Sequence, residues 1–123
     1  MNSTQPAQSP QFPSLLVACL CADWCGACRE YKPLFESLAL KFPNLRFLWV
    51  DVEDESDLID PIEVEDFPTI LIAKDQNPYF FGTVLPHIET LERLIQDKLT
   101  VGEHASLKDA AVIKLVDSLQ NRP

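Results

Sequence analysis

Residues 15–28 read LLVACLCADWCGAC. The apolar run at the start of this segment predicts a strand over Leu15–Cys21, and because it is apolar throughout, we expect both of its faces to be buried. The residues that follow predict a helix over Cys25–Phe42. Cys25 therefore lies at a predicted helix N-terminus, where unpaired N–H groups and the helix dipole favour an anion. A thiolate, which is the reactive form of cysteine, is favoured at such a position.

Cys25 and Cys28 are separated by Gly26 and Ala27. Thiols at this spacing can close a disulfide across one helical turn and open it again. Cys-x-x-Cys within a strand–helix–strand pattern is typical of redox chemistry. A structural zinc site and a pair of inert thiols are the alternatives.

The two other cysteines, Cys19 and Cys21, share one face of the predicted strand because strand side chains alternate. The simplest interpretation is two small buried hydrophobic residues. Cys21 as a third thiol near the active site, open to regulatory oxidation, is the second interpretation. A zinc site made of all four cysteines is the third.

Composition limits the classes of function. The chain has 123 residues, of which 46% are hydrophobic, and a net charge of −9. This predicts a globular protein without the basic surface that nucleic acids and anionic membranes require. No apolar stretch reaches the ~18 residues of a membrane span. A secretory signal begins with basic residues, whereas residues 1–13 carry no Lys or Arg. We therefore expect a cytoplasmic protein. We also expect a monomer.

The hydrophobic pattern predicts a mobile tail over residues 1–13 and one domain over residues 14–123. The expected order is β-α-β-α-β-β-α with one added helix, in a mixed four-stranded α/β sheet flanked by helices on both faces. The predicted strands are Leu15–Cys21, Leu45–Val52, Thr69–Ala73 and Tyr79–Val84, and the predicted helices are Cys25–Phe42, Asp57–Ile62, Pro86–Leu99 and a C-terminal helix over 105–119. A turn is expected at Asp75–Pro78, and Ser106 with Asp109 resembles a capping box for the last helix.

This order, together with Trp24-Cys25-Gly26-Ala27-Cys28, resembles the thioredoxin family. The resemblance extends from about Leu15 to Leu99. Further positions are similar to the family pattern: Pro33 to its helix-kinking proline, Asp51 to an acidic residue that closes the second strand, Phe67-Pro68-Thr69 to its cis-proline turn, and Gly82 to a glycine of its last strand. The resemblance implies a thioredoxin-like fold.

The resemblance also implies a mechanism. Cys25 would attack a substrate disulfide, and Cys28 would then resolve the mixed disulfide. A cis Pro68 would turn the backbone of Phe67 toward Cys25, where an extended substrate could pair with it, and Trp24 would form a wall of the groove. No cofactor is implied beyond the redox-active disulfide. The implied partners are protein disulfides and an electron donor such as thioredoxin reductase. A thioredoxin-fold binding module with weak or no redox turnover is the alternative.

Three departures from the family pattern affect these expectations. Cys19 stands where the family commonly has a buried Asp that helps to deprotonate the deeper cysteine, and Phe47 replaces the Lys that pairs with it. Ala27 replaces the proline between the cysteines, which we expect to shift the redox potential. A buried thiol is a poor base, so we expect resolution by Cys28 to be slow or to depend on water.

Acidic residues crowd the segment before Phe67, and no Lys or Arg occurs from Phe47 to Ala73. The acidic positions are Asp51, Glu53, Asp54, Glu55, Asp57, Asp60, Glu63, Glu65 and Asp66. A solvated surface is the simple interpretation. The alternative is a negative rim beside the groove, made by Glu63, Glu65 and Asp66, that steers basic substrates.

Overall fold

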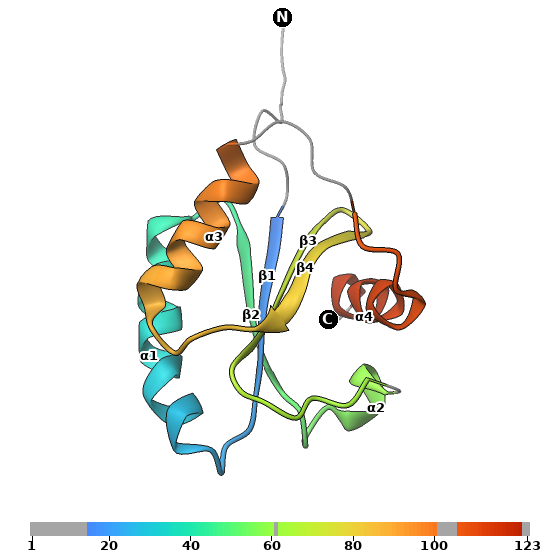
Figure 1. The fold of residues 1–123 in the computed structure, drawn as a ribbon, viewed down its shortest axis with the longest axis horizontal. Helices are drawn as coiled ribbons and strands as arrows, with labels where there is room; N and C mark the ends of the chain where they lie inside the picture. The colour runs from blue at the N-terminus through green and yellow to red at the C-terminus, as the bar shows by residue number, and fades with distance from the viewer. Residues whose placement is uncertain (1–14, 61, 101–105, 122–123) are drawn as a thin grey trace, which may run out of the picture.

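A computed structural model of the chain describes residues 15–60, 62–100 and 106–121. The predicted order of elements is confirmed (Figure 1). The strands are β1 (Leu15–Cys21), β2 (Arg46–Asp51), β3 (Thr69–Lys74) and β4 (Asn77–Thr83), and the helices are α1 (Gly26–Lys41), α2 (Ser56–Ile59), α3 (Ile88–Thr100) and α4 (Ala110–Gln120). The tail expected over 1–13 lies outside the described residues. No helix among the described residues is long and apolar enough to cross a membrane.

The sheet is mixed, with strand order β2-β1-β3-β4. β1 runs parallel to β2 and antiparallel to β3, and β3 is antiparallel to β4. Figure 1 shows α1 and α3 on one face of the sheet and α2 and α4 on the other. All seven residues of β1 are buried, so the prediction that both faces of this strand are covered is confirmed.

The face under α1 and α3 has a core of aromatic, aliphatic and sulfur-bearing side chains. Alternate residues of β1, from Leu15 to Cys21, point into it. From α1 this core receives Cys28, Tyr31, Phe35 and Leu38, and from α3 it receives Leu91 and Ile95. Phe35 packs edge-to-face on Phe47, with ring centroids 5.3 Å apart. Cys19 and Phe47 thus lie in an apolar environment.

The face under α2 and α4 is aliphatic. The other residues of β1 (Leu16, Ala18 and Leu20) pack there against Val112, Leu115, Val116 and Leu119 of α4. These four residues of α4 are spaced by one, three or four positions, which turns them toward the sheet. The added C-terminal helix is therefore a structural layer of the fold.

The turn between β3 and β4 is shorter than predicted. Asn77 and Pro78 belong to β4, and Lys74 pairs with Asn77, so Asp75 and Gln76 alone form the turn. Asp75 takes a left-handed φ of 57°, which Asp tolerates better than most residues. Pro78 is accepted because β4 is an edge strand, where a missing N–H breaks no ladder on the open side.

The last helix also begins later than predicted. Asp109, and not Ser106, is the N-cap of α4, and its carboxylate accepts hydrogen bonds from the backbone N–H groups of Ala111 (2.9 Å) and Val112 (3.2 Å). Leu107 instead donates its backbone N–H to the carbonyl of Pro78 at 2.8 Å. The segment before α4 is thus attached to the edge of the sheet rather than coiled into the helix.

Candidate active site at the start of helix α1

The loop between β1 and α1 fixes the position of Cys25. Its backbone N–H donates to the carbonyl of Ala22 and its own carbonyl accepts from Arg29, both at 3.1 Å. Cys25 is the N-cap of α1, with extended backbone angles, and its side chain is partly buried. Cys25 therefore occupies the start of the helix, and its side chain makes no capping hydrogen bond there.

Cys28, one helical turn further, is almost fully buried, with 1% of its surface exposed. Its sulfur is bonded to Cys21 at the end of β1, across a Cα–Cα distance of 5.8 Å. It also accepts a hydrogen bond from the backbone N–H of Ala22 at 3.4 Å. Cys25 is a free thiol in this structure. The disulfide present is thus Cys21–Cys28, and not the Cys25–Cys28 pair that the motif implied.

Cys19 lies behind this disulfide. Its thiol donates toward the Cys21 sulfur over 3.9 Å, as expected for two residues on one face of a strand. Burial raises the pKa of Cys19, so that it stays protonated at neutral pH. Burial and the nearby Cys19 also raise the pKa of Tyr31, whose hydroxyl is buried with no hydrogen-bond partner among the described residues.

An aromatic pair stands at the mouth of the site. Trp24 is 61% exposed, and its ring meets that of Phe67 edge-to-face at 5.6 Å. Its indole N–H donates to a carboxylate oxygen of Glu53 at 2.9 Å. The Phe67–Pro68 peptide bond is cis. Trp24 is therefore a surface residue, and Glu53, which the sequence analysis did not single out, fixes its orientation.

The residues after Pro68 join this turn to the sheet. The Thr69 hydroxyl donates to the carbonyl of Asp66 at 2.7 Å. Gly82 of β4 lies opposite Ile70 of β3. A Cβ added at Gly82 would meet the ring of Phe80 at 3.6 Å, which is ordinary contact. Packing alone therefore does not require a glycine at this position.

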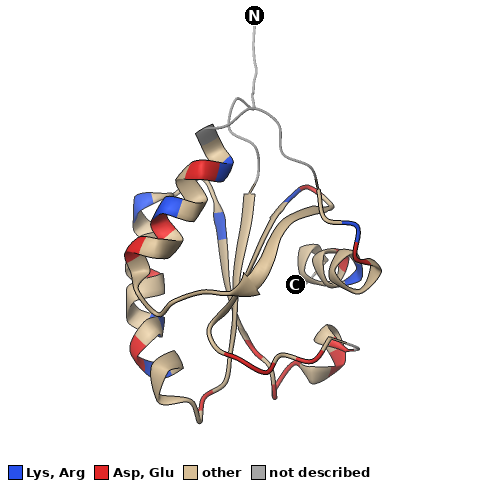
Figure 2. Ribbon diagram, viewed as in Figure 1, with Lys and Arg blue, Asp and Glu red and all other residues tan. Residues whose placement is uncertain are grey.

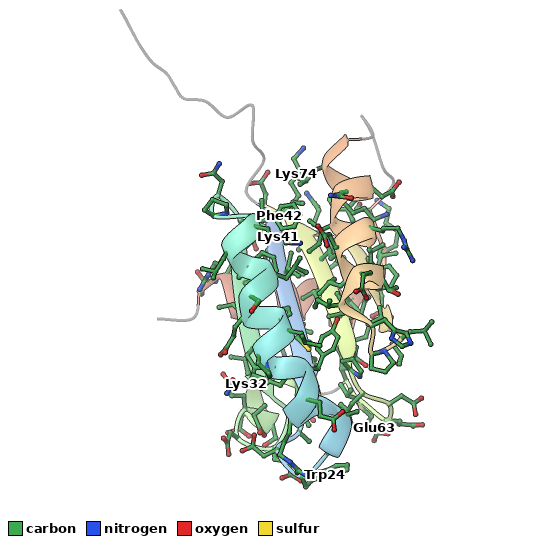
Figure 3. All side chains as sticks on the ribbon, turned by 90° about the vertical axis from the view of Figure 1, so that its left-hand side faces the viewer. Trp24, Lys32, Lys41, Phe42, Glu63 and Lys74 are labelled. Carbon is green, nitrogen blue, oxygen red and sulfur yellow. A yellow bond between two sulfur atoms is a disulfide. The ribbon has the colours of Figure 1, made fainter. Side chains whose placement is uncertain are left out.

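The acidic residues gather at the same end of the molecule. Figure 2 shows acidic positions along the loops between β2 and β3, and Figure 3 places Trp24 and Glu63 at the end opposite to Lys41 and Lys74. Glu63, Glu65 and Asp66 line an open pocket of about 270 Å³, together with Val64, Thr69, Phe81, Gly82 and Thr83. These three acidic residues thus lie next to the turn that contains Pro68.

A second acidic group includes Asp23, the neighbour of Trp24 in the chain. The carboxylates of Asp23, Asp51 and Asp54 lie within 4.8 Å of one another, and they are the only set of three or more potential metal ligands found in the described part of the chain. The four cysteines do not form such a set. Asp51 accepts hydrogen bonds from the backbone N–H groups of Glu53 (2.9 Å) and Asp54 (3.1 Å), which lower the pKa of its carboxyl despite partial burial.

Comparison with known families agrees with this geometry. The thioredoxin family model matches residues 10–97, and the chain therefore belongs to the thioredoxin family. The match ends before α4. Helix α4, which covers the aliphatic face of the sheet, is thus an element outside the family match.

Relatives and solved structures give the same assignment. The chain is 41% identical over 61 residues to a thioredoxin H-type of Fagopyrum esculentum, covering 50% of this chain and 53% of the relative. It is 43% identical over 73 residues to thioredoxin of Callithrix jacchus, covering 59% and 70%. The structure of Fasciola hepatica thioredoxin aligns with a TM-score of 0.63 at 28% identity, covering 69% of this chain and 81% of that one. The chain thus spans about half the length of the first of these relatives.

Proposed function

We propose that the protein is a thiol–disulfide oxidoreductase that reduces or exchanges protein disulfides through Cys25 and Cys28. One observation carries this proposal: Cys25 is a free, partly accessible thiol at the N-cap of α1, beside the exposed ring of Trp24. Membership of the thioredoxin family supports it.

The reaction follows from the positions of the two sulfurs. The Cys25 thiolate attacks one sulfur of a substrate disulfide and forms a mixed disulfide, while the other substrate sulfur leaves as a thiolate. Cys28, in its reduced form, then attacks Cys25 and releases the second substrate sulfur. The N–H of Ala22, 3.4 Å from the Cys28 sulfur, stabilises negative charge on that sulfur during this step.

The substrate groove in this proposal runs between Trp24 and the turn of Phe67, Pro68 and Thr69, with Gly82 at its far side. An extended substrate segment would pair with the backbone of Phe67. Glu63, Glu65 and Asp66 form a rim that favours basic substrates. The proposal further includes a monomer in the cytoplasm, with no prosthetic group, that receives electrons from a reductase such as thioredoxin reductase.

A thioredoxin-fold binding module is the second candidate function. One observation favours it: Cys28 is held in a buried bond to Cys21, and while this bond persists Cys28 cannot resolve a mixed disulfide. In that case the groove or α4 would bind a partner without turnover.

Reduction of insulin, followed with dithiothreitol as electron donor, separates the two. We expect turnover by the wild type, loss of at least about 100-fold in Cys25→Ser, whose hydroxyl is not ionised at neutral pH, and an accumulated mixed disulfide in Cys28→Ser. Cys19→Ala, a buried cysteine outside the proposed reaction, is the matched control and should retain activity.

The same assay tests the rim with a basic and an acidic disulfide peptide. Because salt screens exposed charges, a higher salt concentration should slow reduction of the basic peptide and should not slow reduction of the acidic one. If the wild type matches Cys25→Ser, the oxidoreductase proposal is wrong and the binding module remains.

A further inference from the structure

We infer that Cys21 is a third redox-active cysteine. It replaces Cys25 as the disulfide partner of Cys28 by intramolecular thiol–disulfide exchange. The oxidised state is then held as the buried Cys21–Cys28 disulfide, and Cys25 returns as a free thiol. This inference rests on the proposed function, because the proposed reaction supplies the Cys25–Cys28 disulfide that Cys21 attacks.

The positions of the three sulfurs carry the inference. The Cys28 sulfur is bonded to Cys21. Cys28 also lies one helical turn from Cys25, and this spacing places the two side chains next to each other. Cys28 is therefore within reach of a partner on each side, one on β1 and one at the helix start. Cys21 has 0% and Cys28 has 1% of its surface exposed, whereas Cys25 is partly accessible.

The exchange is balanced without any external reagent. The Cys21 thiolate attacks the Cys28 sulfur of the Cys25–Cys28 disulfide, the Cys21–Cys28 bond forms, and the Cys25–Cys28 bond breaks. The electron pair of the broken bond stays on Cys25, which leaves as a thiolate and takes up the proton that Cys21 gave up. One disulfide is present before and after, so the protein is neither oxidised nor reduced in this step.

The surroundings of Cys21 make this exchange slow. Thr69 is the only polar or charged residue that is buried in the described part of the chain, so the Cys21 thiolate forms at the cost of burial. Exchange is therefore slower than the attack of Cys25 on a substrate.

The two disulfides have different consequences. A Cys25–Cys28 disulfide blocks the nucleophile, whereas the Cys21–Cys28 disulfide leaves it free and removes only the resolving thiol. The protein oxidised in this way still captures a substrate as a mixed disulfide on Cys25 but does not release it by Cys28. Because an external thiol has no access to the buried bond, Cys25 is the group that reopens it, by attacking Cys28 in the reverse direction.

The first test maps the disulfide in the unaltered protein. Fully reduced protein is oxidised with one equivalent of glutathione disulfide, quenched in acid at successive times, and labelled in denaturant with one alkylating reagent before reduction and with a second after it. All four cysteines precede Arg29, the first basic residue of the chain, and so fall in one tryptic peptide, whose fragment masses locate each label. We expect the first label to move from Cys21 to Cys25 with time, and Cys28 to carry the second label throughout.

Two variants sharpen this test. Cys21→Ala should keep the Cys25–Cys28 disulfide, so that labelling of Cys25 is lost after oxidation and does not return. Cys19→Ala, on the same strand and face and equally buried, should recover Cys25 labelling as the wild type does. Circular dichroism shows whether each variant is folded, and the wild-type mapping stands without either of them.

The outcomes separate this inference from the proposed function. If the protein reduces insulin but the first label stays on Cys21 at all times, Cys21 takes no part and the inference is wrong while the function stands. If Cys19→Ala also fails to recover Cys25 labelling, core packing rather than the Cys21 sulfur moves the bond, which contradicts the inference. A wild type that neither gains a disulfide nor reduces insulin contradicts both.

Discussion

The face of the sheet under α1 and α3 and the face under α2 and α4 share the central strand β1 but differ in chemistry. On the first, Cys19 and Cys21 of β1 meet Cys28 and Tyr31 of α1. On the second, Leu16, Ala18 and Leu20 meet only apolar residues of α4 and its neighbours. Since strand side chains alternate, one strand supplies both sets. The comparison indicates that reactive groups are confined to one face, while the other contributes stability.

The relation of the faces to the family match supports this division. The match covers residues 10–97, which include every cysteine and every buried residue of the sulfur-bearing face. Helix α4 lies beyond it and buries Val112, Leu115, Val116 and Leu119 on the far face. The helix outside the family match therefore packs on the face that carries no cysteine.

The largest effect that tests this comparison is expected at Leu115, which is 1% exposed in α4. Leu115→Ala removes buried methyl groups and leaves a cavity, so the free energy of unfolding should fall by about 3 kcal/mol. Insulin reduction per folded molecule should not change, because the reactive sulfurs lie across the sheet. Denaturant unfolding at fixed protein concentration measures the first effect.

The matched control on the same helix is Ile113→Ala, at a position 40% exposed, with an expected change within about 0.5 kcal/mol. A loss below about 1 kcal/mol in Leu115→Ala would contradict the packing of α4 on the sheet, since a buried leucine costs more than that. A changed activity per folded molecule would contradict the division between the two faces.

A smaller effect of opposite sign is expected at Tyr31, on the sulfur-bearing face. Its hydroxyl is buried with no partner among the described residues, and an unpaired buried hydroxyl costs about 1–3 kcal/mol. Tyr31→Phe should therefore raise the free energy of unfolding by about 1 kcal/mol. Tyr79→Phe is the control, because Tyr79 is partly exposed in β4. Destabilisation by Tyr31→Phe would mean that the hydroxyl binds Cys19 or a water molecule.

The sequence predicted the fold well where one local signal dominated. The apolar run Leu15–Cys21 and the cysteine motif were enough to predict the central strand and the start of α1. The beginning of β4 was predicted wrongly because Pro78 is a strong turn signal, which an edge strand overrides. Ser106 and Asp109 both have capping side chains, and Asp109 caps α4 because its position turns Val112 and Leu115 toward the sheet.

The candidate site was predicted less completely. The motif located Cys25 and Cys28, and the resemblance located Phe67 and Pro68. The Cys21–Cys28 bond could not be deduced, because it depends on how closely the end of β1 approaches the first turn of α1, a distance that sequence spacing does not contain. The contact of Trp24 with Glu53 likewise joins two loops that are far apart in the chain.

The last expected effect, which disappears in acid, lies at Asp51 at the end of β2. Backbone hydrogen bonds from Asp54 and Glu53, with further hydrogen bonds from Asp23, lower the pKa of the carboxyl in the folded protein. A lowered folded-state pKa means that the stabilisation is complete above the unfolded pKa of about 3.9 and is lost as pH falls through the folded value. Asp51→Asn, compared with wild type, should therefore cost about 1 kcal/mol at pH 7 and nothing below both pKa values.

Asp54→Asn is the control for charge repulsion among Asp23, Asp51 and Asp54. It removes one of these charges but leaves the Asp51 carboxylate that accepts the two backbone hydrogen bonds. Urea unfolding of both variants and the wild type at several pH values between 2 and 7 measures the difference. Because Asp51 pairs with Cys21 in the β1–β2 register, this loop also adjoins the sulfur-bearing face. Two results would contradict this account: a loss of stability in Asp51→Asn that stays the same in acid, or an equal loss in Asp54→Asn. Either would show that the hydrogen bonds of Asp51 do not stabilise the loop after β2.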